Sequence, residues 1–540
     1  MRIVPVVVAL FLLISLSHSQ AQGLKEALDE RIITGAENAA NEDEIESLSA
    51  LDEFYRRRDL QAIWINPQGL NNRGRELLAL LSEAAADGLN PNDYALTELR
   101  QLSATINIAN IAALEHRLSL SLMQFVSDLG QGRTAPHVAD PDLYPYRQEV
   151  DKSQAIEKAA GAVDLKSFID GYRPQTIRYT RAKAALKQYR ALATNGGWEP
   201  LPAGETLKPG MNDPRVPALR ARLELWGDYS GEISDSKVYD DALVKAVKSM
   251  QYRHGLAQDG VVGKATLKEL NVPVEDRVEQ LIINLERRRW MPDDFGQRYI
   301  FVNLADFTLK LVHEPKTLLD MRVVIGKTYH KTPIFSKDMT YLEINPFWNV
   351  PPSIAGGEIL PKLKKNPNYL NERNFTLLSD WSASAKPVDP SSIDWSQVSR
   401  KTFRWKLRQG PGDNNALGRI KFMLPNHFNI YLHDTPSKSK FTKAVRSFSH
   451  GCIRVHEPVR LADMVLTPQG GWDEARIRDT IASEERRIVK LQQPLPVHIS
   501  YLTAWVNKDN SVHFRGDIYQ RDTQLADTLL GVRSNRFTNR

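Results

Sequence analysis

One short stretch concentrates the side chains that could do chemistry. It reads Ser447-Phe448-Ser449-His450-Gly451-Cys452-Ile453-Arg454-Val455 and holds the single cysteine of the 540-residue chain. A thiol is mostly protonated at neutral pH, so a nucleophilic cysteine needs a base or a positive field beside it to become a thiolate. His450 and Arg454 each stand two residues from Cys452. The stretch therefore predicts thiol chemistry, with Cys452 as the attacking residue.

A second histidine, His433, ends an apolar run and is followed by Asp434. A cysteine, two histidines and an arginine are what thiol acyl transfer requires: a nucleophile, a base, an orienting group and a partner for an oxyanion or carboxylate. Gly451 lets the backbone take a tight path and could turn its N–H groups toward a ligand.

Residue types alone leave two other interpretations open. Cys452 could be an inert buried thiol, because a lone cysteine cannot form an internal disulfide; a histidine and an arginine beside it make a poor apolar pocket. His433, His450 and Cys452 could instead bind zinc. Catalytic zinc needs three protein ligands, often with a glutamate base, and the chain has no His-Glu-x-x-His motif. Ligands spaced His-x-Cys are also sterically awkward.

The elements that must position these residues are strands. β-rich runs separated by polar turns lie at 299–304, 308–312, 321–325, 428–433 and 497–501, with a final hairpin at 512–519. A segment rich in Pro, Asn, Ser and Trp interrupts them at about 348–411. A long irregular insertion of this kind is typical of a lid or substrate wall.

The first part of the chain, from about 24 to 200, has helical periodicity instead. Its apolar stripes are Ile45, Leu48, Leu51 and Phe54; Leu77, Leu80, Leu81 and Ala84; Leu118, Leu122, Phe125 and Leu129; and Leu186, Tyr189 and Leu192. Residues 206–271 predict a small three-helix module, more typical of a binding adaptor than of an enzyme, with Thr266 capping its third helix. Residues 277–290 are typical of a linker helix.

The N-terminus and the charge limit the class of protein. Arg2, an apolar run from Ile3 to Leu16 and the small residues of Ser19-Gln20-Ala21 form the pattern of a cleaved signal peptide. An uncleaved membrane anchor is the alternative, but the run falls short of the roughly 20 residues that span a bilayer. The formal net charge of +6 comes without a dense Lys/Arg tract, which argues against nucleic-acid binding.

Residues 433–455 resemble the signature of the L,D-transpeptidase (YkuD-like) catalytic family: a histidine, about fifteen residues, then Ser-His-Gly-Cys, an apolar residue and an arginine. Residues 345–351, 417–422 and 430–436 look like the long periplasmic members from Gram-negative bacteria. Residues 206–271 resemble the type 1 peptidoglycan-binding domain. The N-terminal helices, with the sequence Asp87-Gly88-Leu89-Asn90-Pro91, are similar to the scaffold domain of the same enzymes.

The resemblance implies a two-step acyl transfer without metal or organic cofactor. Cys452 would attack the carbonyl of diaminopimelate in a tetrapeptide stem and release D-Ala. A second stem amine would then take the acyl group to form a cross-link. His433 would be the general base, His450 an auxiliary histidine, and Ser449, Gly451 and Arg454 would bind substrate or the oxyanion. By the same resemblance, carbapenems acylate Cys452.

The predicted fold class is multidomain α+β. Its expected parts are a signal peptide (1–21), an α-helical scaffold domain (22–205), a peptidoglycan-binding domain (206–271), a linker helix (272–298), a β-rich catalytic domain (299–520) with a lid at about 348–411, and a polar tail (521–540). We expect a periplasmic enzyme of cell-wall biogenesis and cell shape, with at most weak inner-membrane association. Its partners would be peptidoglycan stem peptides and glycan strands.

Two further functions stay open beside transpeptidation. With water as acceptor, the same site would act as an L,D-carboxypeptidase or would cut existing cross-links. The chain could also be a non-catalytic wall-binding protein, although such relics usually lose the nucleophile or the base, and here Cys452, His450 and His433 are all present.

Overall fold

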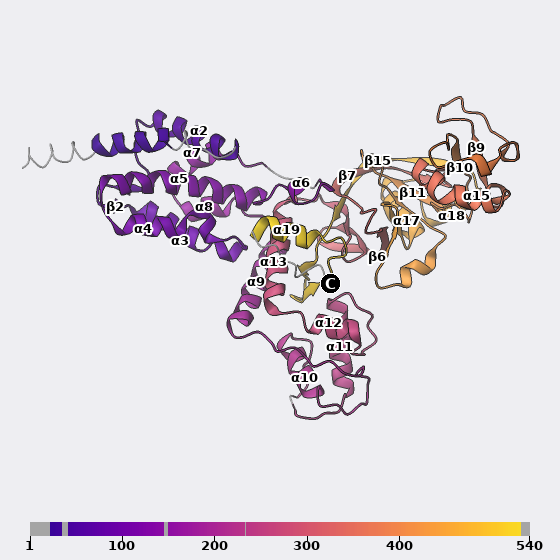
Figure 1. The fold of residues 1–540 in the computed structure, drawn as a ribbon, viewed down its shortest axis with the longest axis horizontal. Helices are drawn as coiled ribbons and strands as arrows, with labels where there is room; N and C mark the ends of the chain where they lie inside the picture. Colours follow the sequence, from indigo (N-terminus) through magenta and orange to yellow (C-terminus); the bar gives the residue numbers. More distant parts are fainter. Residues whose placement is uncertain (1–21, 35–41, 145–148, 233, 531–540) are drawn as a thin grey trace, which may run out of the picture.

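The computed structural model describes residues 22–34, 42–144, 149–232 and 234–530. The predicted signal peptide lies outside these residues. No helix within the described ranges is both long and apolar enough to cross a membrane. Figure 1 shows a helical region at the N-terminal end, a small helical module below the centre, and a β-rich region carrying the lid at the far end. The predicted multidomain α+β class is confirmed.

The scaffold region packs its helices around one long buried helix. Its main helices are α2 (Glu42–Arg57), α3 (Asn72–Ser82), α4 (Leu96–Ala104), α5 (Ile108–Gln131) and α7 (Lys152–Gly161). Three of the predicted stripes face a common core, in which Leu118 and Leu122 on α5 are fully buried. Leu186 and Tyr189 of the fourth stripe lie in a separate cluster with α13 (Val274–Arg289) and β16 (Ala504–Val506). Ile45 is an exception: it lies in the first turn of α2 with 54% of its surface exposed.

The three-helix module is built from α10 (Val216–Leu225), α11 (Asp241–Arg253) and α12 (Lys264–Leu270) around its own apolar core. The prediction of Thr266 as a helix cap is wrong. Gly263 is the N-cap of α12, and Thr266 lies buried inside that helix. Its hydroxyl donates a hydrogen bond to the Val261 carbonyl at 3.2 Å.

Helix α13 (Val274–Arg289) is much more than a linker. Nearly all of it is buried, and it packs against α9 (Ile177–Thr194), α19 (Arg521–Leu530) and β16 (Ala504–Val506). Gln280 donates to the backbone carbonyls of Thr503 and Arg515, and Arg287 pairs with Asp522. The helix therefore joins the scaffold region to the end of the chain.

The predicted polar tail begins instead as helix α19. Leu525 and Leu529 face the main core, and the buried Arg521 donates from Nε to Asp140 at 2.9 Å. The sequence suggested a polar tail because charged residues stand among the apolar ones. In the folded protein these charges are paired internally, as Arg521 is with Asp140. Residues 531–540 lie outside the described ranges.

The β-rich region is one large mixed sheet. Its strands run in the order β11 (Ile420–Met423), β12 (Leu432–His433), β14 (Ile453–Val455), β6 (Lys316–Gly326), β5 (Thr308–His313), β4 (Arg298–Asn303), β15 (Arg487–Ser500), β7 (Ile334–Ile344) and β3 (Leu143–Tyr144). Because β11 also pairs with β7, the sheet closes on itself and encloses a core. The short strand β13 (Ser447–Ser449) pairs with β6. The sequence did not predict β7.

The lid is folded rather than irregular. It contains a three-stranded sheet of β8 (Trp348–Asn349), β10 (Lys406–Gln409) and β9 (Phe375–Leu378), together with α14 (Pro352–Ile354), α15 (Leu360–Lys365) and α16 (Tyr369–Glu372). A separate apolar cluster, with Leu363 and Leu407 fully buried, holds it together. A lid with its own core can move as one body, because its packing does not depend on the sheet beneath it.

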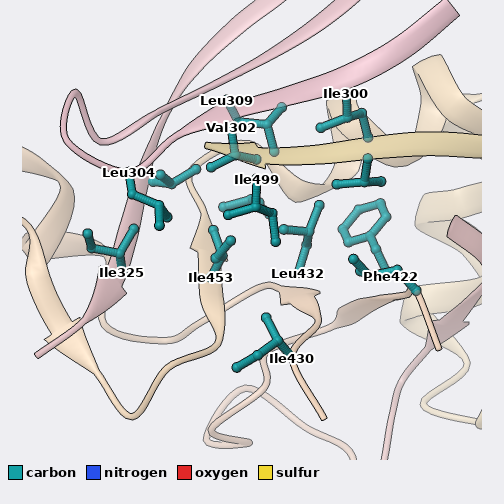
Figure 2. Packing of buried hydrophobic residues seen from close by; sticks show 14 of the residues in the cluster. Ile300, Val302, Leu304, Leu309, Ile325, Phe422, Ile430, Leu432, Ile453 and Ile499 are labelled. Carbon is teal, nitrogen blue, oxygen red and sulfur yellow. The ribbon is translucent and has the colours of Figure 1, made fainter. Parts of the chain in front are cut away.

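Figure 2 shows how the enclosed core fixes the direction of side chains near the predicted site. Leu432 on β12 and Ile453 on β14 point into it, among Val302, Ile325 and Ile499. Successive side chains of a strand point to opposite faces. The neighbours of these two residues, His433 and Arg454, are therefore directed to the other face of the sheet.

Candidate active site

A row of polar side chains crosses four strands of the sheet on the face opposite the core. Strand register pairs Glu343 with Lys421, Lys421 with His433, and His433 with Arg454. Paired residues of adjacent strands project to the same side, so the row collects an acid, two cations and an imidazole. Cys452 immediately precedes β14 and lies at the end of this row.

The Cys452 thiol is half-buried, and its environment contains opposing influences. Burial raises its pKa above the ordinary value. The backbone N–H and hydroxyl of Tyr431, and then the charges of Lys421 and Arg454, act in the other direction because they stabilise the thiolate. The net direction is upward, so the resting thiol is protonated at neutral pH and needs a base when it attacks.

The loop that carries Cys452 is held rigidly by Ser449 and Gly451. The buried Ser449 hydroxyl donates to the Cys452 carbonyl at 2.6 Å and accepts from the Gly451 N–H at 3.1 Å. Gly451 has a φ of +117°, which disfavours any residue with a Cβ. Thr332 donates to the Gly451 carbonyl at 2.7 Å. Both predicted residues therefore shape the turn, and the Gly451 N–H is already engaged.

His433 is buried and its environment keeps the ring neutral. Burial, and after it the charge of Arg454, lowers its pKa to about 3. Its Nδ1–H donates to the backbone carbonyl of Asp434, which leaves Nε2 as the acceptor of the ring. The Tyr431 ring lies 5.7 Å from the His433 ring and also contacts the thiol. A neutral imidazole with a fixed tautomer meets the requirement for a general base.

His450 takes a different direction from the one predicted. Its Nε2 lies 2.6 Å from Glu358 Oε1 in the π-helical turn of the lid, and its ring packs 5.2 Å from that of His330. No contact between His450 and the thiol occurs among the described residues. The structure therefore joins His450 to the lid, while His433 and Arg454 lie in the polar row, paired across β12 and β14, and β14 begins directly after Cys452.

Arg454 is mostly buried, and its Nε has no hydrogen-bond partner within the described ranges. A buried guanidinium without a partner is costly unless an anion completes it. The position of Arg454 beside the thiol suits a carboxylate of a bound ligand.

Sequence reasoning missed three residues of the site: Lys421, Tyr431 and Glu358. The Lys421 ammonium lies 4.1 Å from the centre of the Tyr431 ring, and both belong to segments that carry the family resemblance. Residue spacing alone gave no sign of them, because strand pairing brings Lys421 to His433 from twelve residues away. No group of three or more potential metal ligands is gathered within the described ranges.

Replacing Lys421 with methionine is expected to raise the pKa of Cys452 further, because one of the charges that stabilises the thiolate is removed. Alkylation by iodoacetamide near pH 7.5 should slow by up to about tenfold, since one pKa unit changes the thiolate fraction tenfold. The measurement is the alkylation rate as a function of pH, with Lys490→Met on β15 as the control. An unchanged midpoint would show that Lys421 does not act on the thiol.

Comparison with known proteins places the three regions in known families. A scaffold domain matches residues 49–186, a "Putative peptidoglycan binding domain" matches residues 212–270, and an L,D-transpeptidase catalytic domain matches residues 297–486. A Haemophilus influenzae protein named "Putative L,D-transpeptidase" is 35% identical over 260 residues, which cover 48% of this chain and 50% of that protein. The chain thus spans about half the length of this relative.

Three solved structures were also found. An L,D-transpeptidase from Stackebrandtia nassauensis is 15% identical (TM-score 0.20; 56% of this chain, 96% of that one), and one from Xylanimonas cellulosilytica is 13% identical (TM-score 0.16; 55% and 98%). A fused Zn-dependent amidase/peptidase from Clostridium acetobutylicum is 11% identical (TM-score 0.14; 55% and 100%). Residues 297–486 thus match an L,D-transpeptidase catalytic domain, which this chain combines with regions that match a peptidoglycan-binding domain and a scaffold domain.

Proposed function

We propose that this protein is a peptidoglycan L,D-transpeptidase that uses Cys452 as its nucleophile. The observation that carries the proposal is the gathering of Cys452, Tyr431, Lys421, His433 and Arg454 on one face of the sheet. A protonated thiol, a neutral imidazole on the neighbouring strand and two cations suit attack on a carbonyl and stabilisation of the charge that develops.

In the first step, His433 Nε2 takes the thiol proton as the sulfur attacks the diaminopimelate carbonyl of a tetrapeptide stem. The C–N bond to the terminal D-Ala breaks, the proton passes to the departing amine, and a thioester remains on Cys452. In the second step, a stem amine attacks the thioester, and the thiol recovers its proton as the new amide forms. Two easier barriers thus replace one high barrier.

The other residues have supporting parts in this proposal. Ser449 and Gly451 position the loop of the nucleophile, and Arg454 binds a substrate carboxylate. The contact between His450 and Glu358 holds the lid against the nucleophile loop, so that water is kept from the thioester. The peptidoglycan-binding domain would bind glycan strands, in the periplasm, after cleavage of residues 1–21.

Product analysis tests the reaction. The protein is incubated with disaccharide–tetrapeptide muropeptides, and the products are identified by mass spectrometry. Cross-linked dimers, formed with release of D-Ala, support transpeptidation. Tripeptide monomers alone would assign the site to an L,D-carboxypeptidase. Unchanged muropeptides with a folded protein would contradict catalysis and favour a wall-binding role.

A further inference from the structure

A second cavity lies on the side of the β-rich region that faces the scaffold. Its volume is about 370 Å³, and it is bounded by α9, α13, the outer side of β4 and β5, and the turn after β16. Five cationic side chains and two carboxylates line it. Cavities of this size that combine apolar walls with a few convergent polar groups are typical of small-molecule sites.

Arg288, on α13, is the unusual member of this lining. Only 7% of its surface is exposed, and its Nε is buried without a hydrogen-bond partner. No hydrogen bond or ion pair joins its guanidinium to another residue in the part of the chain that is described. Its neighbours on the helix differ: Arg287 pairs with Asp522 and Arg289 pairs with Glu286 at 2.8 Å.

The two carboxylates of the cavity do not neutralise Arg288. Glu314 is bound by Arg178 at 3.2 Å and by the Tyr299 hydroxyl at 2.7 Å, while Asp306 pairs with Arg515 at 2.6 Å. Burial, and after it the charge of Arg178, lowers the pKa of Arg288 to about 10, so the group still carries its charge at neutral pH. The cavity therefore holds a buried cation that lacks an anion.

Part of the wall is apolar. Met291 and Phe295 follow the end of α13, and Phe301 and Val312 come from β4 and β5. Phe295 and Phe301 lie with ring centres 5.7 Å apart. A ligand that fills this space must combine an apolar body with an anionic group that reaches the guanidinium.

We propose that this cavity binds a small organic carboxylate with an apolar or aromatic body, held by Arg288. The planar guanidinium fork matches a carboxylate in a bidentate arrangement, which would satisfy the donors that lack partners. An unpaired buried charge destabilises the folded chain. A ligand that pairs with this charge, and that binds only the folded chain, removes the cost and stabilises the fold. The site is separate from Cys452 and does not depend on the proposed reaction.

Binding of 3-phenylpropionate to the full exported chain tests the proposal. Titration calorimetry is carried out on the Cys452→Ala background, so that the result is independent of catalysis. We expect 3-phenylpropionate to bind at least tenfold more tightly than 3-phenylpropan-1-ol, which lacks the charge, and than acetate or inorganic phosphate, which lack the body. Equal binding of acid and alcohol, or no binding of the acid at millimolar concentration, would overturn the proposal.

Substitutions of Arg288 test whether the ligand binds in this cavity. Arg288→Met is expected to weaken binding of 3-phenylpropionate at least tenfold while keeping or raising Tm, because it removes an unpaired buried charge. Arg288→Lys should restore part of the affinity. Arg460→Met, at an exposed arginine paired with Glu457, is the matched control and should change nothing. Unchanged affinity in Arg288→Met would overturn the assignment. If that variant does not fold, Arg181→Gln replaces it, with the same expected weakening.

Discussion

Cys452→Ala is expected to abolish acylation by a carbapenem completely. In the native chain Tyr431, Lys421 and Arg454 stabilise the thiolate, and His433 lies on the neighbouring strand, so a strained amide should leave a single acyl adduct on the sulfur. Alanine offers no nucleophile, and the loss of a nucleophile typically lowers turnover by at least about 10³-fold. The measurement is intact-protein mass after incubation, together with cross-linking of muropeptides.

The control for this prediction is the variant Ser447→Ala, because the Ser447 hydroxyl, on the same strand as Ser449, makes no hydrogen bond to the Cys452 loop among the described residues. It should be acylated like the native chain. If the folded native protein gains no mass from the carbapenem, the thiol is inert. The interpretation as a non-catalytic wall-binding protein would then be favoured. An adduct that persists in Cys452→Ala would place the acceptor elsewhere.

His433→Gln is expected to lower kcat/KM by about 10²- to 10⁴-fold, the usual range for the loss of a general base. Because the pKa of His433 is lowered to about 3, the native ring stays neutral throughout the neutral range, and its protonation should not limit activity until the solution is strongly acidic. The measurement is the pH dependence of kcat/KM for both proteins.

The lowered pKa of His433 also makes the stability of the folded chain depend on pH. In the unfolded chain His433 takes up a proton near its ordinary pKa of about 6.5, whereas the folded chain resists it down to about 3. The unfolded state therefore binds more protons between these values, and stability is lost as the pH falls through them. His433→Gln should lose less stability than the native chain over this window.

The variant His450→Gln tests whether His433 and His450 have different roles. Its contact is with Glu358 on the lid, so we expect it to keep most of the alkylation rate of Cys452 and to change KM more than the reactivity of the thiol. An inactive His450→Gln combined with a nearly normal His433→Gln would exchange the roles proposed here.

Local features of this protein could be predicted from the sequence, and features that depend on strand pairing could not. The helical stripes of the scaffold follow a period that the chain itself displays, and most of their residues are buried, in two separate clusters. The Ser449–Arg454 motif likewise pointed to the loop of Cys452, whose role as the nucleophile stays a prediction. Lys421 and Tyr431 were missed because strand register, not spacing, brings them to Cys452 and His433.

The features that the sequence did not reveal have a common physical origin. The contact of His450 with Glu358 on the lid joins residues that lie 92 positions apart in the chain. Helix α19 and helix α13 looked polar because their charges are paired with distant residues, as Arg521 is with Asp140 and Arg287 with Asp522. Only the folded chain reveals that such charges are internal.

The position of β15 determines how much of the chain must be present before the sheet can close. This strand lies between β4 and β7, yet it ends at Ser500, and helix α19 follows it. One of the inner strands of the sheet therefore comes from a late part of the chain. A chain that ended before β15 would leave β4 and β7 without their shared partner, so the assembly of the sheet requires that the chain has been made at least this far.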